Sequence, residues 1–233
     1  MIKKETLSTL QLSPRLMKIA QLLPVCHTIA DIGTDHAYIP IFAILNQRAK
    51  RAIASDINAG PVERARVNVA EFGLDEKISL RLGAGLETLS PNEAEVICIS
   101  GMGGILISEI INSSLPIAAN AKRLILQPMT AAKELREYLC QNGFFIEEEV
   151  LVCEEDKIYN ILSVTFQKGC VYSEKELVVG RYSLNTDEKL LERHKNQILK
   201  KLKIKLKGLE KSRLEENKNE AQEVGRLISL IEE

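Results

Sequence analysis

The sequence of 233 residues predicts an α/β fold with a doubly wound, mostly parallel sheet, followed by a helical C-terminal segment. Three observations lead to this prediction. Apolar runs of strand length alternate five times with segments of helical character. Two more strand-like runs then follow each other with only residues 154–158 between them. Beyond about Tyr172, strand signals stop and apolar residues recur at helical spacing.

Start and stop signals place the individual helices and strands. Ser13 can cap a helix whose first residue is Pro14, and Pro24 ends that helix. A later helix opens at Pro61 and stops at Gly73. The expected helices cover residues 13–23, 38–47, 61–72, a stretch after Gly104, and a stretch that Thr130 caps and that ends near Asn142. The expected strands cover residues 28–32, 51–56, 78–82, 96–100, 123–126, 144–153 and 159–167.

The last two strands are joined too tightly for a helix to lie between them, so they must be antiparallel. Five β-α units closed by an antiparallel hairpin are the layout of class I, Rossmann-like methyltransferases. A flavodoxin-like or dinucleotide-binding fold does not end in this way. We therefore expect a class I methyltransferase domain over residues 1–168 and a helical domain over residues 169–233.

The turn after the first strand carries most of the ionisable side chains that suggest a binding site. The strand ends at Asp31 and Gly33, and Asp35 and His36 follow at once. Gly33 lets the backbone approach a ligand closely, because it has no Cβ. Two carboxylates repel a phosphate, so the turn favours a positively charged ligand such as S-adenosylmethionine over NAD or ATP. Acid-x-glycine turns also end many ordinary strands, so a purely structural turn remains an alternative.

A second acid supports a binding site. Asp56 ends the second strand about 20 residues further on, where this architecture binds a ribose diol. The sequence contains neither the glycine-rich dinucleotide fingerprint nor a P-loop. The two acids together therefore indicate a nucleoside ligand that carries positive charge.

Composition limits the classes of protein that remain. The formal net charge is −1, so any nucleic-acid partner must meet a local patch of charge. The five cysteines are odd in number and scattered, which argues against a disulfide framework or a zinc site and fits a reducing cytoplasm. No apolar run approaches the length of a membrane span, and no signal-peptide core is evident. We expect a cytoplasmic protein without membrane or metal partners.

The C-terminal segment reads as a helical hairpin, most simply an antiparallel coiled coil. Its apolar seams are Leu191, Ile198, Leu202 and Leu209 on one arm and Val224, Leu227, Ile228 and Ile231 on the other, with a turn at residues 215–219. The first arm carries a large excess of basic side chains: Arg193, Lys195, Lys200, Lys201, Lys203, Lys205, Lys207, Lys211 and Arg213. Either this is a solvated coiled-coil face, or it contacts nucleic-acid phosphates.

Four segments together resemble a known family. Asp31–Pro40, Ser55–Ile57, Ser100–Gly104 and Gln127–Met129 are similar, in order and spacing, to the bacterial tRNA adenine-22 N1-methyltransferases. The resemblance covers residues 8–168 well and the helical tail more loosely. It implies S-adenosylmethionine as methyl donor, an adenine in the D-arm of tRNA as acceptor, and a coiled-coil domain that helps to hold the tRNA. We expect the protein to act as a monomer.

The resemblance also implies roles for individual residues. The expected cofactor-binding residues are Asp31, Gly33, Thr34, Asp35, His36, Tyr38, Asp56, Ile57, Gly83, Ala84, Gly85, Ser100 and Gly101. The expected catalytic residues are His36, Gly101, Met102, Gly103 and Gly104, and the expected substrate-binding residues are Gln127, Pro128, Lys200, Lys203 and Lys207. Related enzymes commonly place a polar residue, often Asp, where this chain has Ala84, so the contact to the adenine amino group must come from elsewhere. His36 can equally be a packed, hydrogen-bonded histidine.

Two other functions remain possible from the sequence. One is a methyltransferase that uses the same donor with another acceptor, against which the basic helical arm argues. The other is an RNA-binding protein without catalytic activity, against which Asp31, Gly33 and Asp56 argue.

Overall fold

The computed structural model describes residues 10–167, 171–182, 186–211 and 215–233. The chain forms two compact units, Met1–Cys170 and Val171–Glu233. Arg213, one of the basic residues of the expected hairpin, lies outside the described residues.

The first unit is built on a seven-stranded sheet with the strand order β3-β2-β1-β4-β5-β7-β6. Strands β1 to β5 pair in parallel, whereas β7 runs antiparallel to both β5 and β6. The prediction of a parallel sheet closed by an antiparallel hairpin is therefore confirmed. The strands are β1 (Cys26–Ile32), β2 (Ala49–Asp56), β3 (Ile78–Leu82), β4 (Val96–Gly103), β5 (Arg123–Thr130), β6 (Phe144–Glu154) and β7 (Lys157–Phe166).

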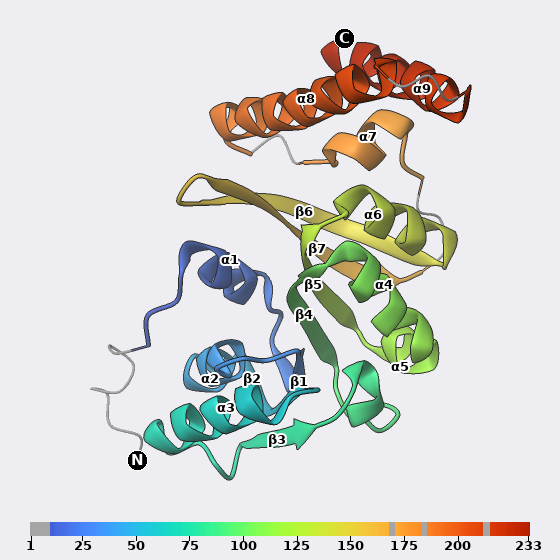
Figure 1. Ribbon diagram of the computed structural model, residues 1–233. Helices are drawn as coiled ribbons and strands as arrows, with labels where there is room; N and C mark the ends of the chain where they lie inside the picture. Colours follow the sequence, from blue (N-terminus) through green and yellow to red (C-terminus); the bar gives the residue numbers. More distant parts are fainter. Residues whose placement is uncertain (1–9, 168–170, 183–185, 212–214) are drawn as a thin grey trace. The chain divides into compact units, whose positions relative to one another are not determined.

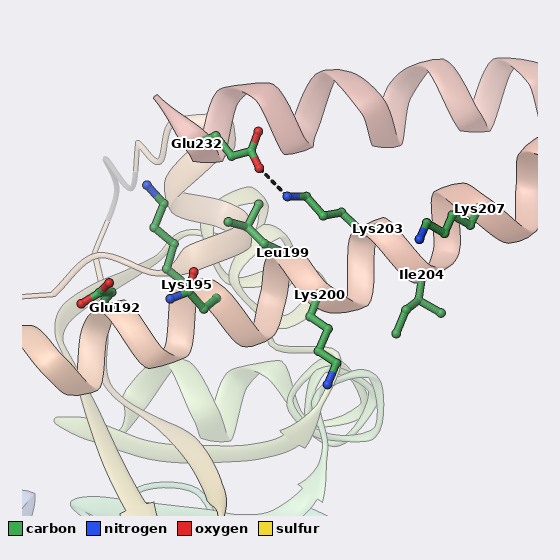
Figure 2. A pocket seen from close by; sticks show the side chains of 9 residues that line it. Glu192, Lys195, Leu199, Lys200, Lys203, Ile204, Lys207 and Glu232 are labelled. Atoms are coloured by element: carbon green, nitrogen blue, oxygen red, sulfur yellow. Dashed lines mark hydrogen bonds and ion pairs between the residues drawn. The ribbon is translucent and has the colours of Figure 1, made fainter.

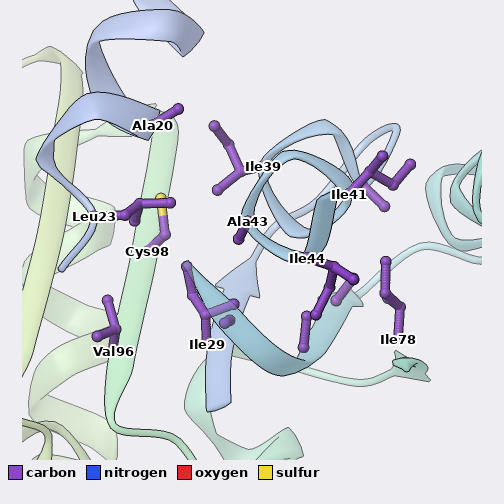
Figure 3. Close-up of a cluster of buried hydrophobic side chains, with 14 of the residues drawn as sticks. Ala20, Leu23, Ile29, Ile39, Ile41, Ala43, Ile44, Ile78, Val96 and Cys98 are labelled. Carbon is purple, nitrogen blue, oxygen red and sulfur yellow. The ribbon is translucent and has the colours of Figure 1, made fainter. Parts of the chain in front are cut away.

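Helices cover the two faces of this sheet (Figure 1). Helices α1 (Pro14–Leu22), α2 (Tyr38–Leu45) and α3 (Ala59–Glu71) lie on one face, and α4 (Gly104–Ser113), α5 (Leu115–Asn120) and α6 (Ala132–Gln141) lie on the other. The core beneath α1 and α2 is aliphatic: Ala20, Leu23, Ile29, Ile39, Ile41, Ala43, Ile44, Ile78, Val96 and Cys98 are buried together (Figure 3). Ser13 caps α1 as expected, since its hydroxyl accepts from the N–H of Leu16.

The carboxyl ends of β4 and β5 differ from the prediction. Both strands continue past Ser100 and Leu126, so that Met102 pairs with Pro128 and Gly103 with Thr130 across two register shifts. The expected loops are thus the irregular ends of two paired strands. Thr130 does not cap α6: the N-cap residue is Ala131, which is left-handed and makes no side-chain cap. The sequence also gave no sign of α5 or of the short 3-10 helix η2 (Gly85–Thr88).

A bulge in β6 places a charged pair inside the first unit. Ile146 pairs with Val164 and Glu148 with Ser163, so Glu147 is the extra residue and the alternation of side chains shifts there. Glu149 therefore points inward, where it pairs with Arg136 of α6; the side chains are 0% and 1% exposed. Asn160 of β7 accepts from the same guanidinium. The pair ties α6 to the hairpin of β6 and β7.

The second unit consists of α7 (Glu174–Val179), α8 (Glu188–Glu210) and α9 (Glu215–Glu232), of which α8 and α9 lie side by side (Figure 1). A capping box of Ser173 and Glu176 starts α7. The apolar core joins Val179 of α7 to Leu199 of α8 and to Val224, Ile228 and Ile231 of α9. The turn expected at residues 215–219 is wrong, because those residues form the first turns of α9.

Three further sequence-based expectations can be compared with the structure. Cys26 and Cys98 are buried cysteines outside any disulfide, but Cys140 is disulfide-bonded, which the scattered cysteines did not predict. Among the helices of the described residues, none combines the length and apolar character needed to span a bilayer. The described residues also contain no group of three or more histidine, cysteine, aspartate or glutamate side chains arranged for a metal ion.

Candidate functional site

A pocket of about 320 Å³ opens at the carboxyl ends of β1 and β4, beside the first turns of α1 and α2. This is the edge at which open α/β sheets bind ligands. Its lining contains eight of the predicted cofactor-binding residues: Asp31, Gly33, Thr34, Asp35, His36, Tyr38, Ser100 and Gly101. It also contains Arg15, Leu16, Ala37 and Ile39, which were not predicted as site residues.

Asp31 is the buried acid of this pocket. The residue is 6% exposed, and burial raises its pKa to about 6. Hydrogen bonds from Thr34 and Cys98 oppose this rise, because they stabilise the carboxylate. Asp31 pairs with Cys98 in the β1–β4 ladder, so both side chains point to the face that α1 covers. Cys98 is therefore both part of the apolar core and a hydrogen-bond partner of the acid.

The turn after Asp31 is held against β2. The N–H groups of Gly33 and Thr34 both donate to the carbonyl of Ser55, at 2.8 and 2.9 Å. Gly33 has φ +78°, and a Cβ added to it would lie 1.9 Å from the terminal methyl of Met102. The positive φ favours glycine, whereas the contact with Met102 involves the end of a flexible side chain, which can move. Met102, predicted as catalytic, thus lies against the floor of the turn.

Asp35 and His36 form a cluster at the rim of the pocket. Asp35 is 58% exposed in its side chain and pairs with Arg64 of α3. The ring of His36 lies 3.3 Å from the other oxygen of Asp35 and stacks on Tyr38 with 5.1 Å between ring centroids. Because Arg64 already neutralises Asp35, the buried Asp31 is the better partner for a positively charged ligand.

Asp56 lies further along the same edge, outside the lining of the pocket. Its side chain accepts from the N–H of Asn58 at 2.7 Å, and its carbonyl accepts from the N–H of Gly83 at 3.0 Å. Ile57 is 67% exposed beside it. The ends of β2 and β3 thus bring Asp56, Ile57 and Gly83 together, and Ala84 follows as the N-cap of η2.

The glycines after Ser100 have different environments. A Cβ on Gly101 would have only a guanidinium nitrogen of Arg15 near it, 4.0 Å away, although φ is +79°. A Cβ on Gly103 would meet the hydroxyl of Thr130 at 3.3 Å, and one on Gly104 would meet the carbonyl oxygen of Ala131 at 2.2 Å. Gly101 therefore faces the pocket, whereas Gly104, at the start of α4, lies against the backbone of Ala131, where a Cβ would not fit.

The remaining predicted residues are not in this pocket. Gln127 and Pro128 are buried at the end of β5, and Gln127 makes its hydrogen bonds inside the protein. Gly85 lies in η2, and Lys200, Lys203 and Lys207 lie on α8 of the second unit. Arg15 was missed because no motif surrounds it. Its one signal is a cation in the first turn of a helix, where the helix dipole disfavours positive charge.

The raised pKa of Asp31 gives a prediction for stability. Between about pH 4 and pH 6 the folded protein keeps a proton that the unfolded chain has lost, so the free energy of unfolding falls as the pH rises. A difference of about two pKa units corresponds to roughly 3 kcal/mol. Asp31→Asn should remove this dependence. Denaturant unfolding at several pH values should therefore show that the free energy of unfolding of the variant rises relative to that of the wild type as the pH increases to about 6. Parallel pH profiles of the two proteins would contradict the burial of an ionisable Asp31.

Comparison with known proteins agrees with this geometry. A family model described as a methyltransferase domain matches residues 12–162. The tRNA (adenine(22)-N(1))-methyltransferase of Bacillus subtilis is 41% identical over 156 residues, which are 67% of this chain and 66% of that protein. In this alignment the chain spans slightly less than two thirds of the relative's length.

Solved structures cover nearly the whole chain. The crystal structure of the B. subtilis M1A22 tRNA methyltransferase TrmK is 32% identical and superposes with a TM-score of 0.86, covering 96% of this chain and 98% of that one. TrmK of M. capricolum, in complex with the cofactor product S-adenosylhomocysteine, is 29% identical with a TM-score of 0.79, covering 95% of this chain and 96% of that one. The chain therefore belongs to the family of tRNA (adenine(22)-N1)-methyltransferases.

Proposed function

We infer that this protein transfers a methyl group from S-adenosylmethionine to N1 of adenine 22 in tRNA. The observation that carries this inference is the pocket with the buried Asp31 at the ends of β1 and β4. The chain that holds this pocket superposes on 98% of the length of the TrmK structure. A methyltransferase for another acceptor would need the same donor site, so the acceptor is what an experiment must establish.

The residues at the sheet edge fit the donor. S-adenosylmethionine carries an ammonium group, for which Asp31 offers a carboxylate shielded from water. Gly33 leaves its backbone open to close approach. Asp56 can accept from the ribose hydroxyls through the carboxylate oxygen that Asn58 does not use. The exposed Ile57 offers an apolar surface for the adenine ring.

The acceptor chemistry requires little from ionisable side chains. When bound, the donor supplies an electrophilic methyl group, and adenine N1 attacks it with a lone pair and no proton to lose. The protein must therefore align the two reactants, which is a contribution of proximity and orientation. Ser100 and Gly101 line the pocket where β4 ends, and the bare backbone of Gly101 leaves space for a flat base. His36 lies at the rim, stacked on Tyr38, where it can contact the base without acting as a catalytic base.

We predict that the purified protein transfers radiolabelled methyl groups from S-adenosylmethionine into tRNA that has adenine at position 22. Nucleoside analysis should identify N1-methyladenosine. The same tRNA with guanine at position 22 should remain unlabelled and serves as the control. Label in both tRNAs would mean another acceptor, and donor binding without any transfer would support a non-catalytic RNA-binding protein.

Helix α8 supports a second part of the proposal, the contact to tRNA. A hollow of about 630 Å³ runs along this helix and is lined by Lys195, Lys200, Lys203 and Lys207 (Figure 2). Lys203 is paired with Glu232 at 2.6 Å. Lys200 and Lys207 form no ion pair within the described ranges of the chain. We propose that these two unpaired lysines contact phosphates of the tRNA.

The pairing of Lys203 provides an internal comparison for this proposal. Lys200→Gln and Lys207→Gln should each weaken tRNA binding and reduce the slope of log affinity against log salt by about one, because one fewer counterion is released. Lys203→Gln should change the slope less, since Glu232 already neutralises that charge. Filter binding over a range of salt concentrations measures all three slopes. Equal slopes for the wild type and the first two variants would show that α8 is only structural.

A further inference from the structure

Arg15 is a cation that faces the pocket and whose guanidinium is hydrogen-bonded to a neutral amide, although the carboxylate of Glu154 lies near enough to interact with its charge. It lies in the first turn of α1, where its backbone N–H donates to Glu154 at 2.9 Å. The guanidinium itself donates to the neutral amide oxygen of Gln127 at 2.8 Å and lies over the ring of Tyr159, 5.7 Å from its centre. In the described parts of the chain, no carboxylate forms an ion pair with it. A charge held in this way is available to an anionic ligand.

Gln127 fixes the position of this guanidinium. The residue is 0% exposed, and its amide nitrogen donates to the carbonyl of Pro128 at 2.8 Å. The amide oxygen must therefore point the other way, where it accepts from both Arg15 and the N–H of Gly101, the latter at 3.2 Å. Gln127 thus joins α1 to the pocket end of β4. Being neutral, it holds Arg15 without cancelling its charge.

The pocket therefore presents two opposite charges to a ligand. Asp31 and Arg15 both belong to its lining. Asp31 pairs with Cys98, and Ser100 pairs with Gln127, so Asp31, Ser100 and Gln127 lie on the same face of three adjacent strands. An α-amino acid group carries an ammonium and a carboxylate on one carbon. One acid and one unpaired cation in the same small pocket match that pair of charges.

We propose that Arg15 binds the α-carboxylate of the methyl donor and that Gln127 is the positioning residue that holds Arg15 in place. This inference rests on the proposed function, since it assigns residues to the donor site. A phosphate of the tRNA is the competing anion. The donor carboxylate is favoured because Arg15 shares its pocket with Asp31, whose carboxylate would repel a phosphate.

The test compares two ligands that differ only in the carboxylate. Isothermal titration should measure the affinity of the full-length protein for S-adenosylmethionine and for decarboxylated S-adenosylmethionine. The wild type should prefer the first by about ten- to a hundredfold, the usual range for a charge-assisted hydrogen bond. Arg15→Leu should bring this ratio close to one. Arg15→Lys should retain part of it, and Lys18→Leu, on the same helix but outside the pocket, should leave it unchanged.

Variants of Gln127 test the positioning role with the same ratio. Gln127→Glu places a carboxylate beside Arg15, which should neutralise it and remove the preference for S-adenosylmethionine. Gln127→Met removes the acceptor and should lower the ratio to a value between those of the wild type and Arg15→Leu. A loss of packing alone would weaken both ligands equally and leave the ratio unchanged. Thermal unfolding of each variant shows whether it is folded.

The possible outcomes separate the inference from the proposed function. A ratio that stays at the wild-type value in Arg15→Leu overturns the inference, even if the wild type methylates tRNA. If Arg15→Leu binds both donor ligands with wild-type affinity but binds tRNA more weakly, Arg15 contacts a phosphate of the tRNA instead. A wild-type protein that neither binds S-adenosylmethionine in the titration nor transfers its methyl group to tRNA contradicts the proposed function itself.

Discussion

The packing of β1 against β4 is the constraint on which the site depends. Asp31 pairs with Cys98 in this ladder, which places a carboxyl group beneath α1 among aliphatic side chains. Ionising an acid in such a position is unfavourable, as its raised pKa indicates. A ligand that brings an ammonium group to Asp31 removes this penalty. Ionised Asp31 is therefore unfavourable in the protein without ligand and becomes favourable when the ammonium group of the donor binds beside it.

The surrounding elements serve this arrangement. Helix α1 brings Arg15 over the same face, and Gln127 ties it to the end of β4. The turn at Gly33 is fixed by two hydrogen bonds to Ser55 of β2. Ala37, the N-cap of α2, is left-handed with φ 54°, which is unusual for a residue with a Cβ. Backbone strain of this kind tends to occur at binding sites, where surrounding contacts enforce it.

Local sequence signals predicted most of the fold and the turn of the site. The alternation of apolar runs and helix caps placed the strands and α1, and the short connection at residues 154–158 predicted the antiparallel hairpin. Asp31, Gly33 and their neighbours were predicted because they form one contiguous motif at a strand end. Arg15 could not be found in this way, and Gln127 was expected to bind substrate rather than Arg15, because the contact between the two joins residues 112 positions apart.

Other differences between the sequence-based predictions and the structure also arise from contacts between residues far apart in the chain. The extension of β4 and β5 past Ser100 and Leu126 depends on pairing between the two strands, and Glu149 turns inward because of a bulge. Neither effect is visible in local periodicity. The glycines after Ser100 seemed equivalent in sequence, and only the structure separates Gly101, which lines the pocket, from Gly104, which lies against the backbone of Ala131.

The most direct test of the central claim is the pH dependence of donor binding. Titration of S-adenosylmethionine in two buffers of different ionisation enthalpy measures both the affinity and the protons exchanged. If the ammonium group binds ionised Asp31, affinity should fall below about pH 6 with release of a proton on binding, and Asp31→Asn should bind weakly at every pH. The Asp31→Asn variant shows whether the pH dependence comes from Asp31 or from the nearby His36. Affinity that does not change across this range, with no proton release, would contradict the account.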